Sequence, residues 1–417
     1  GVTGTNGKTT TAHLLQPLLA AGGRRTGLIG TVEIRVGDER VPSARTTPEA
    51  PDLHALFARM RDAGVGACAM EVSSHALRLH RVDGLVLDVA VFTNLSQDHL
   101  DFHRDMEDYF AAKAELFTPR RSRRAVVAVD DAWGRRLART ATVPVTTVAT
   151  AGAGGEDADW RVVDVVPGRR GSTFTAVSRD GRRLALGCPL PGAFNVANAA
   201  LAAIAALEAG VDPADVERGS AAAGGVPGRM QPVTTGTPDE PVVVVDYAHT
   251  PDALERALGT LRAGTPHRLV VVLGAGGDRD PGKRPAMGAA AARLADVVVV
   301  TDDNPRSEDP ALVRAAVLSG ARAAAGAGTR VLEVPDRREA VAAGLAACAG
   351  EGDTLLLAGK GHERGQEVAG RVLPFDDAGV AAELLRARAA RPAATAGTST
   401  TERPGPGVLP IRRGGTQ

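Results

Sequence analysis

The first ten residues, GVTGTNGKTT, combine interior glycines, a lysine and several hydroxyl side chains at close spacing. Gly4 and Gly7 allow the backbone to turn tightly, so that successive N–H groups point at phosphate oxygens. Lys8 supplies a positive charge for the β- and γ-phosphates of a nucleotide, and the Thr9 hydroxyl is placed to bind Mg²⁺. A helix predicted over Thr11–Leu19 would direct its positive end at the same anion. A plain glycine-rich turn is the alternative, but the lysine and hydroxyls at this spacing favour a phosphate-binding loop.

Potential metal ligands follow two apolar strands, which are predicted at Ala67–Met70 and Val89–Phe92. Glu71 comes directly after the first strand, and His99 comes shortly after the second. The carboxyl ends of parallel strands face the ligand crevice of an α/β sheet, so both side chains are candidates to bind one Mg²⁺ with Thr9. The alternatives are a solvated salt bridge for Glu71 and a structural role for His99. Two strands that both end in metal-type ligands favour the site.

Short β-branched runs alternate with Ala- and Leu-rich helical stretches along most of the chain. This alternation indicates βαβ units, and therefore an α/β fold whose parallel sheets carry helices on both faces. A more β-like insert is expected over Arg161–Leu190. The Gly- and Pro-rich segment 224–228 marks a boundary, and from Ala389 the chain loses periodicity. We therefore predict three parts: a domain at 1–228, a second domain at 229–388 and a disordered tail at 389–417.

The composition excludes several classes of protein. Lys+Arg and Asp+Glu both number 49, and this balance argues against a general binder of nucleic acid or membrane surfaces. No apolar run is as long as the roughly 18 residues that a membrane span needs, and we expect no signal peptide. The cysteines are Cys68, Cys188 and Cys348, and their wide spacing predicts neither a disulfide framework nor a zinc site. We expect a cytoplasmic monomer that acts on small molecules.

The loop TGTNGKTT resembles that of the Mur ligases and the related folylpolyglutamate synthetases. The resemblance extends to about residue 388 through EVSSHAL (Glu71–Leu77), TNLSQDHLDFH (Thr93–His103), NVAN (Asn195–Asn198), PGRM (Pro227–Met230), DYAHTP (Asp246–Pro251), GGDRD (Gly276–Asp280), GKRP (Gly282–Pro285), DNPR (Asp303–Arg306) and GKGHE (Gly359–Glu363). These motifs are similar to those of the Mur ligases that add the third peptide residue to UDP-N-acetylmuramoyl-L-Ala-D-Glu in peptidoglycan synthesis. The resemblance implies a P-loop central ATPase domain, residues 1–228, and a C-terminal Rossmann-like α/β domain.

The resemblance also implies an N-terminal domain, which we expect to be missing here. The chain starts at Gly1, inside a motif and without Met. Family members carry an N-terminal domain that holds the uridine diphosphate end of the substrate, so we expect a truncated chain. Remote binding energy helps to align a reacting group, and weaker affinity for the UDP-linked substrate and slower turnover are therefore expected.

The reaction implied by the resemblance is an ADP-forming ligation of an acid with an amino acid. MgATP phosphorylates the D-Glu side-chain carboxylate, the incoming amine attacks the acyl phosphate, and phosphate leaves. Expected ATP contacts are Gly4, Thr5, Asn6, Gly7, Lys8, Thr9 and Thr10, with Asn195 and Asn198 on the adenine side and Asp246 on the ribose. The catalytic set is Lys8, Lys113, Arg229 and His249. Lys113, which by its helical context alone would be an exposed lysine, is implied to be carbamylated (N6-carboxylysine) and to bind Mg²⁺ as an anion.

Two further residue sets are implied for the other substrates. The muramyl dipeptide is expected to contact Thr46, Thr47, Ser73 and Arg81. The incoming amino acid is expected to contact Arg279, Asp303, Asn304, Pro305, Arg306, Gly359 and Glu363. DNPR resembles the signature for meso-diaminopimelate, whose second carboxylate fits the bidentate fork of an arginine, whereas lysine has no such carboxylate. Glu363 is expected to pair with the distal ammonium, and Gly359 to let the backbone approach the ligand. A surface turn at Asn-Pro is the alternative for DNPR.

Three positions depart from the family pattern. Leu79 replaces a Gln that would contact the substrate, Arg45 stands where members can carry Asn, and Ala275 replaces a Cys. Rival functions are a lysine-adding ligase, a folylpolyglutamate-type ligase and a non-catalytic P-loop nucleotide-binding fragment. DNPR and GKGHE argue against the folylpolyglutamate type, and Glu71, His99 and Lys113 argue against the non-catalytic fragment.

Overall fold

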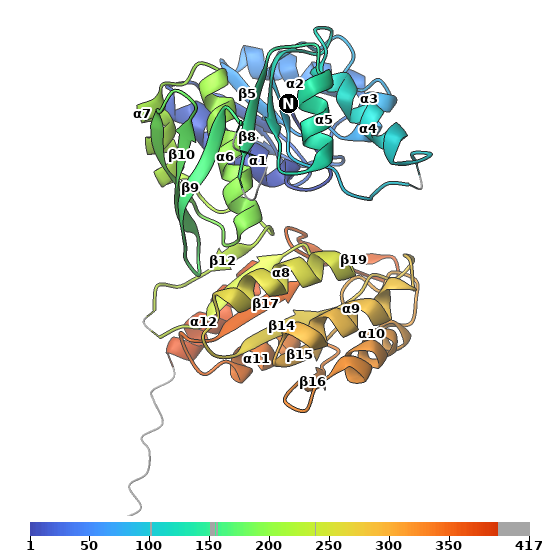
Figure 1. Ribbon diagram of the computed structural model, residues 1–417. Coiled ribbons are helices and arrows are strands. Elements are labelled where there is room, and N and C mark those ends of the chain that lie inside the picture. The colour runs from blue at the N-terminus through green and yellow to red at the C-terminus, as the bar shows by residue number, and fades with distance from the viewer. Residues whose placement is uncertain (101, 151–154, 156, 238, 391–417) are drawn as a thin grey trace, which may run out of the picture.

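The computed structural model describes residues 1–100, 102–150, 155, 157–237 and 239–390. Two α/β units lie one above the other, and the chain passes between them through the segment before β12 (Gln231–Val233) (Figure 1). Among the described residues, no helix is both long and apolar enough to cross a membrane. The predicted tail lies outside the described residues beyond 390, and Ala389 itself ends the last helix.

The larger sheet of the first unit has seven strands. Their order is β1 (Val2–Thr3), β6 (Leu87–Phe92), β7 (Ser122–Ala128), β8 (Val145–Ala149), β9 (Trp160–Pro167), β10 (Ser172–Ser178) and β11 (Arg183–Cys188). The pairs from β1 to β9 are parallel, and the pairs β9–β10 and β10–β11 are antiparallel. The β-like insert expected over Arg161–Leu190 is therefore an antiparallel extension of the parallel sheet.

A second, four-stranded sheet was not anticipated from the sequence. Its order is β4 (Glu39–Val41), β3 (Ile34–Val36), β2 (Thr26–Ile29) and β5 (Ala67–Met70). An isolated parallel bridge between Val2 and Glu71 connects it to the phosphate-loop strand. This bridge brings the carboxyl end of β5 beside the loop, and so explains how Glu71 reaches the candidate site.

The helices of the first unit are α1 (Lys8–Ala21), α2 (Ala50–Asp62), α3 (Ser74–Arg78), α4 (Met106–Ala114), α5 (Ala132–Thr140), α6 (Ala193–Glu208) and α7 (Pro213–Ala222), with a 3₁₀ turn η1 at Glu115–Phe117. α1 begins at Lys8, three residues before the predicted start, because Gly7 takes a left-handed conformation immediately before it. Small alanine side chains let α6 pack closely on α1, and most of α6 is buried. The packed helices α1 and α6 support the phosphate loop, which leads directly into α1.

The second unit has a six-stranded sheet. Its order is β12, β13 (Val242–Asp246), β17 (Thr354–Ala358), β14 (Leu269–Leu273), β15 (Val297–Val300) and β16 (Arg330–Glu333), with only β12 antiparallel. The helices are α8 (Pro251–Ala263), α9 (Lys283–Leu294), α10 (Pro310–Ala324), α11 (Arg337–Ala347) and α12 (Asp377–Ala389), and β18 (Gly365–Val368) forms a hairpin with β19 (Arg371–Pro374). Alternate strand residues pack on α8–α10 and on α11–α12, so helices cover both faces.

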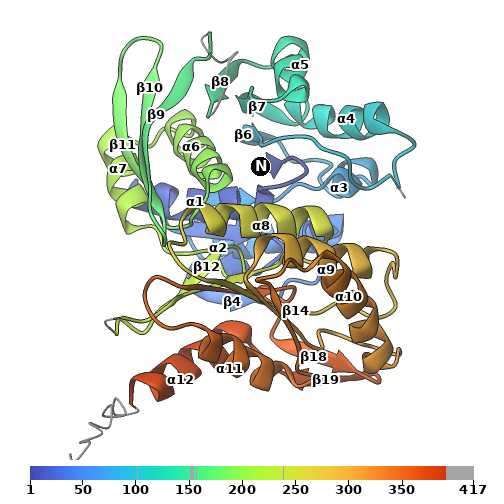
Figure 2. The same cartoon turned by 60° about the horizontal axis from the view of Figure 1, so that its bottom comes forward.

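The predicted fold class is confirmed: the first unit holds the phosphate loop on a largely parallel sheet, and the second is a Rossmann-like α/β unit. The hairpin between β9 and β10 extends toward the second unit (Figures 1 and 2). There, Arg169 donates to the Asp353 carbonyl at 2.8 Å, and Arg170 pairs with Glu240 at 3.1 Å. These contacts tie the two units together.

Candidate active site

The phosphate loop depends on its glycines for two reasons. Gly4 and Gly7 have φ of +144° and +85°, which L-residues rarely adopt. A Cβ at Gly4 would collide with the Thr93 hydroxyl, and one at Gly7 would collide with the Asn198 amide. Lys8 Nζ donates to the carbonyls of Gly4 at 3.0 Å and Thr5 at 2.8 Å. The lysine is thus folded back over the loop, and burial is the main cause that lowers its pKa.

Glu71 lies beneath the loop and is almost fully buried. Its carboxylate accepts hydrogen bonds from Thr9 Oγ1 at 2.9 Å, Thr31 N at 2.7 Å and Thr31 Oγ1 at 3.1 Å. The hydroxyl and carboxylate oxygens of Thr9 and Glu71 are the ligand type that Mg²⁺ prefers. Thr31 was missed by the sequence interpretation, because only the approach of β2 to β5 brings it to Glu71.

A cavity of about 340 Å³ opens beside the loop. Its lining consists of Lys8, Arg45, Thr46, Thr47, Ser73, Ser74, His75, Arg81, His99 and Lys113. The cavity therefore brings together the four residues predicted for the muramyl dipeptide and three predicted for catalysis or metal binding. None of the described residues in this lining is acidic, so the arrangement suits an anionic ligand. Leu79 does not line the cavity, and its side chain is exposed.

Lys113 points from α4 to the phosphate loop and is 1% exposed. Its Nζ donates to the Gly4 carbonyl at 2.8 Å and lies 4.6 Å from the centre of the Tyr109 ring. Among the described residues, no ion pair includes Lys113. Burial, and then the positive charge of Lys8, hold the pKa of Lys113 well below its ordinary value. The side chain is therefore buried against the phosphate loop, and is not the exposed lysine that its helix alone predicted.

Hydrogen bonds and one ion pair fix the positions of Thr47, Ser73 and Arg81 around the cavity. Thr47 Oγ1 donates to the Glu71 carbonyl at 2.9 Å and accepts from Ser73 N at 3.1 Å. Arg81 pairs with Glu49 at 2.9 Å and donates to the Thr47 carbonyl at 3.3 Å, while its buried Nε lacks a protein partner. The Ser73 hydroxyl caps α3 by accepting from Ala76 N. An orphaned guanidinium N–H inside an anion-suited cavity is a donor ready for a ligand.

His99 stands at the rim of the cavity with φ of +54°. Its ring contacts His75 at 5.0 Å between centroids, and Phe102 stacks on His75 at 4.1 Å. Burial is the largest cause that lowers the pKa of His99, so the imidazole is neutral near pH 7. Glu71 does not line this cavity, and the described residues contain no cluster of three His, Cys, Asp or Glu side chains suited to a metal. The predicted metal ligands are thus divided, with Thr9 and Glu71 under the loop and His99 beside Lys113.

The second unit contributes Arg229 at the junction. Its guanidinium lies 4.8 Å from the centre of the Tyr247 ring, and its buried Nε has no protein partner. Its charge also contributes to the lowered pKa of Lys8, after burial, so it faces the phosphate loop. His249 Nδ1 lies 2.7 Å from the Tyr247 carbonyl, and burial lowers its pKa. A proton on Nδ1 would satisfy that carbonyl and leave Nε2 as an acceptor.

Three predicted ATP contacts are already engaged within the protein. Asn195 donates to the Pro191 carbonyl at 2.8 Å, and Asn198 donates to Asn195 Oδ1 at 3.3 Å. Asp246 accepts from Met230 N at 2.7 Å, and burial raises its pKa. These side chains support the loop and the junction, and a nucleotide would meet them only after some rearrangement.

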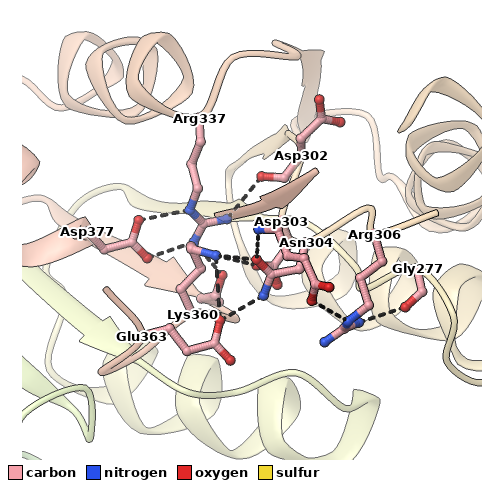
Figure 3. A network of polar contacts seen from close by, with 11 residues as sticks. Gly277, Asp302, Asp303, Asn304, Arg306, Arg337, Lys360, Glu363 and Asp377 are labelled. Carbon is pink, nitrogen blue, oxygen red and sulfur yellow. Dashed lines mark hydrogen bonds and ion pairs between the residues drawn. The ribbon is translucent and has the colours of Figure 1, made fainter. Parts of the chain in front are cut away.

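The residues predicted for the incoming amino acid lie on three loops: Arg279 follows β14, and the others follow β15 and β17 (Figure 3). Asn304 Nδ2 donates to Glu363 Oε2 at 2.8 Å, and Arg306 Nε donates to Glu367 Oε2 at 3.1 Å. Arg306 also donates to the Gly277 carbonyl at 2.7 Å, where Pro305 packs against Gly277. Arg279 is exposed and donates only weakly to the Asp278 carbonyl, at 3.3 Å.

Four charged residues of this region were missed by the sequence interpretation: Arg337, Lys360, Glu367 and Asp377. Arg337 and Asp377 are fully buried and form a bidentate pair, with contacts of 2.8 and 2.7 Å. Arg337 also donates to the Ala358 carbonyl at 3.0 Å, directly before Gly359. The signal for Lys360 was its place between the two glycines of GKGHE.

A family model described as the Mur ligase middle domain matches residues 2–207, and one described as the Mur ligase, glutamate ligase domain matches residues 228–361. The chain belongs to the Mur ligase family. Members of this family are ATP-dependent, ADP-forming amide ligases. The two matched segments of this Mur ligase carry the phosphate loop and the DNPR loop respectively.

Relatives of this Mur ligase cover nearly all of its described length. The UDP-N-acetylmuramoyl-L-alanyl-D-glutamate–2,6-diaminopimelate ligase of Streptomyces coelicolor is 55% identical over 386 residues, which is 93% of this chain and 75% of the relative. A UDP-N-acetylmuramyl-tripeptide synthetase of Leifsonia xyli is 50% identical over 388 residues, 91% of this chain and 74% of the relative. A solved structure of a 2,6-diaminopimelate ligase has 37% identity and a TM-score of 0.68, covering 93% of this chain and 78% of its own.

Proposed function

We propose that the chain joins meso-diaminopimelate to UDP-N-acetylmuramoyl-L-Ala-D-Glu, with MgATP as co-substrate, in peptidoglycan precursor synthesis. The observation that carries the proposal is the composition of the 340 Å³ cavity. Lys8 and Lys113 share that cavity with Thr46, Thr47, Ser73 and Arg81, so a substrate carboxylate held by the second group would lie beside the two lysines. A site that both binds the carboxylate and receives the γ-phosphate is what acyl-phosphate formation requires.

The positive charge of the cavity fits the phosphoryl transfer. Lys8 and the loop N–H groups would bind the phosphates from one side, and Arg229 would approach from the second unit. These groups are fixed donors aimed at the place where negative charge gathers. The incoming amine would then attack the acyl phosphate with its lone pair, the carbon–oxygen bond to phosphate would break, and the amine would release one proton. His249, neutral with an acceptor nitrogen, is placed at the junction to take that proton.

Lys113 is proposed to be carbamylated. A neutral amine attacks CO₂ to give a carbamate and one proton, and the lowered pKa of Lys113 favours that neutral form. The product is an anion inside a cavity that has no acidic lining among its described residues. Thr9 and Glu71 would hold Mg²⁺ under the phosphates, and the Lys113 carbamate with His99 would offer further ligands. A bound Mg²⁺ neutralises charge that develops on the transferred phosphoryl group.

A ligation assay tests the function. Purified chain is incubated with UDP-N-acetylmuramoyl-L-Ala-D-Glu, MgATP and either meso-diaminopimelate or L-lysine, and phosphate release and product mass are followed. We expect phosphate and tripeptide to form only when all three substrates are present. A site that pairs the second carboxylate should favour meso-diaminopimelate by about 10²-fold or more in kcat/KM. Preference for L-lysine would contradict the assignment of the amine, and ATP binding without any ligation would contradict the enzyme proposal.

A further inference from the structure

Lys360 has no exposed surface, and its loop is built to turn its side chain inward. The flanking Gly359 and Gly361 have φ of +110° and +55°. A Cβ at Gly359 would lie 2.8 Å from Asp303 Oδ2, and one at Gly361 would lie 2.7 Å from Tyr247 Cβ. Neither flanking position accommodates a side chain. The two glycines therefore allow close packing that seats Lys360 between the loops.

The Lys360 ammonium links loops that follow two different strands. Its Nζ donates to Asn304 Oδ1 at 2.8 Å and to Asp303 Oδ1 at 3.3 Å, and both acceptors follow β15 (Figure 3). It also lies 3.5 Å from Glu363 Oε2 on its own loop, after β17. Three acceptors match the three N–H bonds of an ammonium. Removing the cation would leave the buried Asp303 carboxylate without its partner, so the contact holds both loops at one separation.

Asn304 connects Lys360 to Glu363 by hydrogen bonds, and so fixes the position of Glu363 as well. The Asn304 side-chain Oδ1 accepts from Lys360 Nζ and from Glu367 N at 3.0 Å, and Nδ2 donates to Glu363 Oε2. The direction of the Asn304 amide is thereby set, because only its oxygen can face the ammonium. Glu363 remains about one-third exposed in its side chain, so it is positioned by the protein and still accessible to a ligand.

The distal centre of diaminopimelate places an ammonium and a carboxylate on one carbon, at a fixed spacing. Under the proposed function, on which this inference rests, Glu363 receives the ammonium and Arg306 the carboxylate. These two residues belong to different loops. We propose that Lys360 is a positioning residue for amino-acid selection, which touches no substrate but sets the separation between Glu363 and Arg306.

Lys360→Met tests the inference, because methionine keeps a similar length without the ammonium. We expect the KM for meso-diaminopimelate to rise about 10²-fold, as for a misplacement of about 1 Å, while the KM values for ATP and the UDP-linked substrate stay within about threefold. The preference for meso-diaminopimelate over L-lysine should fall by a similar factor. Lys360→Gln keeps one donor for Asn304, should change the same quantities less, and serves as the test if Lys360→Met does not fold.

Asp353→Asn is the matched control. Asp353 is 3% exposed, stands at the opposite end of β17, and accepts from Arg268 N at 2.8 Å. We expect this variant to lower Tm without changing the KM for meso-diaminopimelate or the preference over L-lysine. Unchanged KM and preference in a folded Lys360 variant would overturn the inference, and so would an equal change in the Asp353 variant.

Calorimetric titration with meso-diaminopimelate in the presence of MgADP separates this inference from the proposed function. If the unaltered chain binds the amino acid but forms no product, the ligation proposal fails, and the Kd ratio between that chain and Lys360→Met still tests Lys360. If the unaltered chain ligates and Lys360→Met keeps its KM, only the Lys360 inference fails. If the unaltered chain neither binds nor ligates, both fail.

Discussion

Charged side chains are arranged in opposite ways in two regions. One is the cavity beside the phosphate loop, and the other is the C-terminal polar network, which consists of Asp303, Asn304, Arg337, Lys360, Glu363 and Asp377. Lys8 and Lys113 donate to backbone carbonyls, and none of the ion pairs among the described residues includes either of them. In the C-terminal network each buried cation faces a carboxylate, as in Arg337–Asp377 and Lys360–Asp303. The first region keeps a positive field for anions that arrive with the substrates. The second is already balanced, which suits a ligand group that brings one charge of each sign.

The largest effect is expected from replacing Lys113, which belongs to no ion pair among the described residues. Lys113→Met should lower kcat about 10⁴-fold, the scale on which loss of a catalytic side chain acts, while leaving Tm unchanged or higher. The reason is that the cavity loses its proposed carbamate, but no buried carboxylate loses a partner. Steady-state ligation and thermal unfolding measure the two quantities. A clear fall in Tm would show that Lys113 supports the fold, and would weaken the contrast between the two regions.

The pH dependence of the unfolding free energy tests whether the pKa of Lys113 is lowered in the folded chain. Its pKa in the folded chain lies well below the ordinary 10.5. Between those two values the unfolded chain binds the extra proton, so stability should rise with pH across that window. In CO₂-free buffer, Lys113→Met should show less of this rise than the unaltered chain. Equal slopes in both proteins would mean that Lys113 keeps an ordinary pKa.

A large loss of stability is expected when one member of a buried ion pair is removed, in contrast to the unchanged Tm expected for Lys113→Met. Arg337→Met should destabilise the second unit by about 3–5 kcal/mol, because it leaves the Asp377 carboxylate buried and unpaired. Denaturant unfolding followed on the C-terminal transition measures the loss. Arg337→Met combined with Asp377→Leu should recover much of it, since no charge is then left alone. A double variant as unstable as the single one would show that packing, and not charge, dominates at this position.

The sequence predicted the first region better than the second, for a physical reason. The loop from Gly4 to Thr10 is local, so spacing alone indicates its geometry. Strand-end placement also predicted Glu71 correctly as a neighbour of the loop, because the carboxyl ends of parallel strands share one edge. Thr31 could not be predicted, since its contact with Glu71 requires the four-stranded sheet, which no sequence pattern indicated.

The C-terminal network depends on contacts distant in sequence. Arg337 opens a helix 40 residues before its partner Asp377, and nothing in either local pattern distinguishes them from surface charges at helix starts. Gly359 was predicted to admit a ligand, and the structure shows that it also makes room for Asp303. The resemblance correctly pointed to DNPR and GKGHE as neighbours, but the burial of Lys360 became visible only in three dimensions.

Smaller effects are expected at Arg306, whose guanidinium is only partly occupied by contacts within the protein. Its Nε faces Glu367, and its Nη1 donates to the Gly277 carbonyl, in a side chain that is about one-fifth exposed. Arg306→Ala should raise the KM for meso-diaminopimelate about 10–100-fold, within the range for loss of one partner of a charge pair. The KM for L-lysine should change little, because lysine has no distal carboxylate. Ligation kinetics with both amines measure the difference.

Glu367→Gln tests whether Glu367 competes with the substrate carboxylate for Arg306 or orients Arg306 toward it. If the substrate carboxylate must displace Glu367 from the guanidinium, the neutral amide should compete less, and the KM for meso-diaminopimelate should fall a fewfold, about 1 kcal/mol. A higher KM would instead mean that Glu367 orients the Arg306 fork for the substrate. Either result leaves Arg306 as the carboxylate receptor, whereas equal loss for both amines in Arg306→Ala would remove it from that role. Comparing the two variants therefore separates the affinity that Arg306 supplies from the effect of the carboxylate that the protein already places against it.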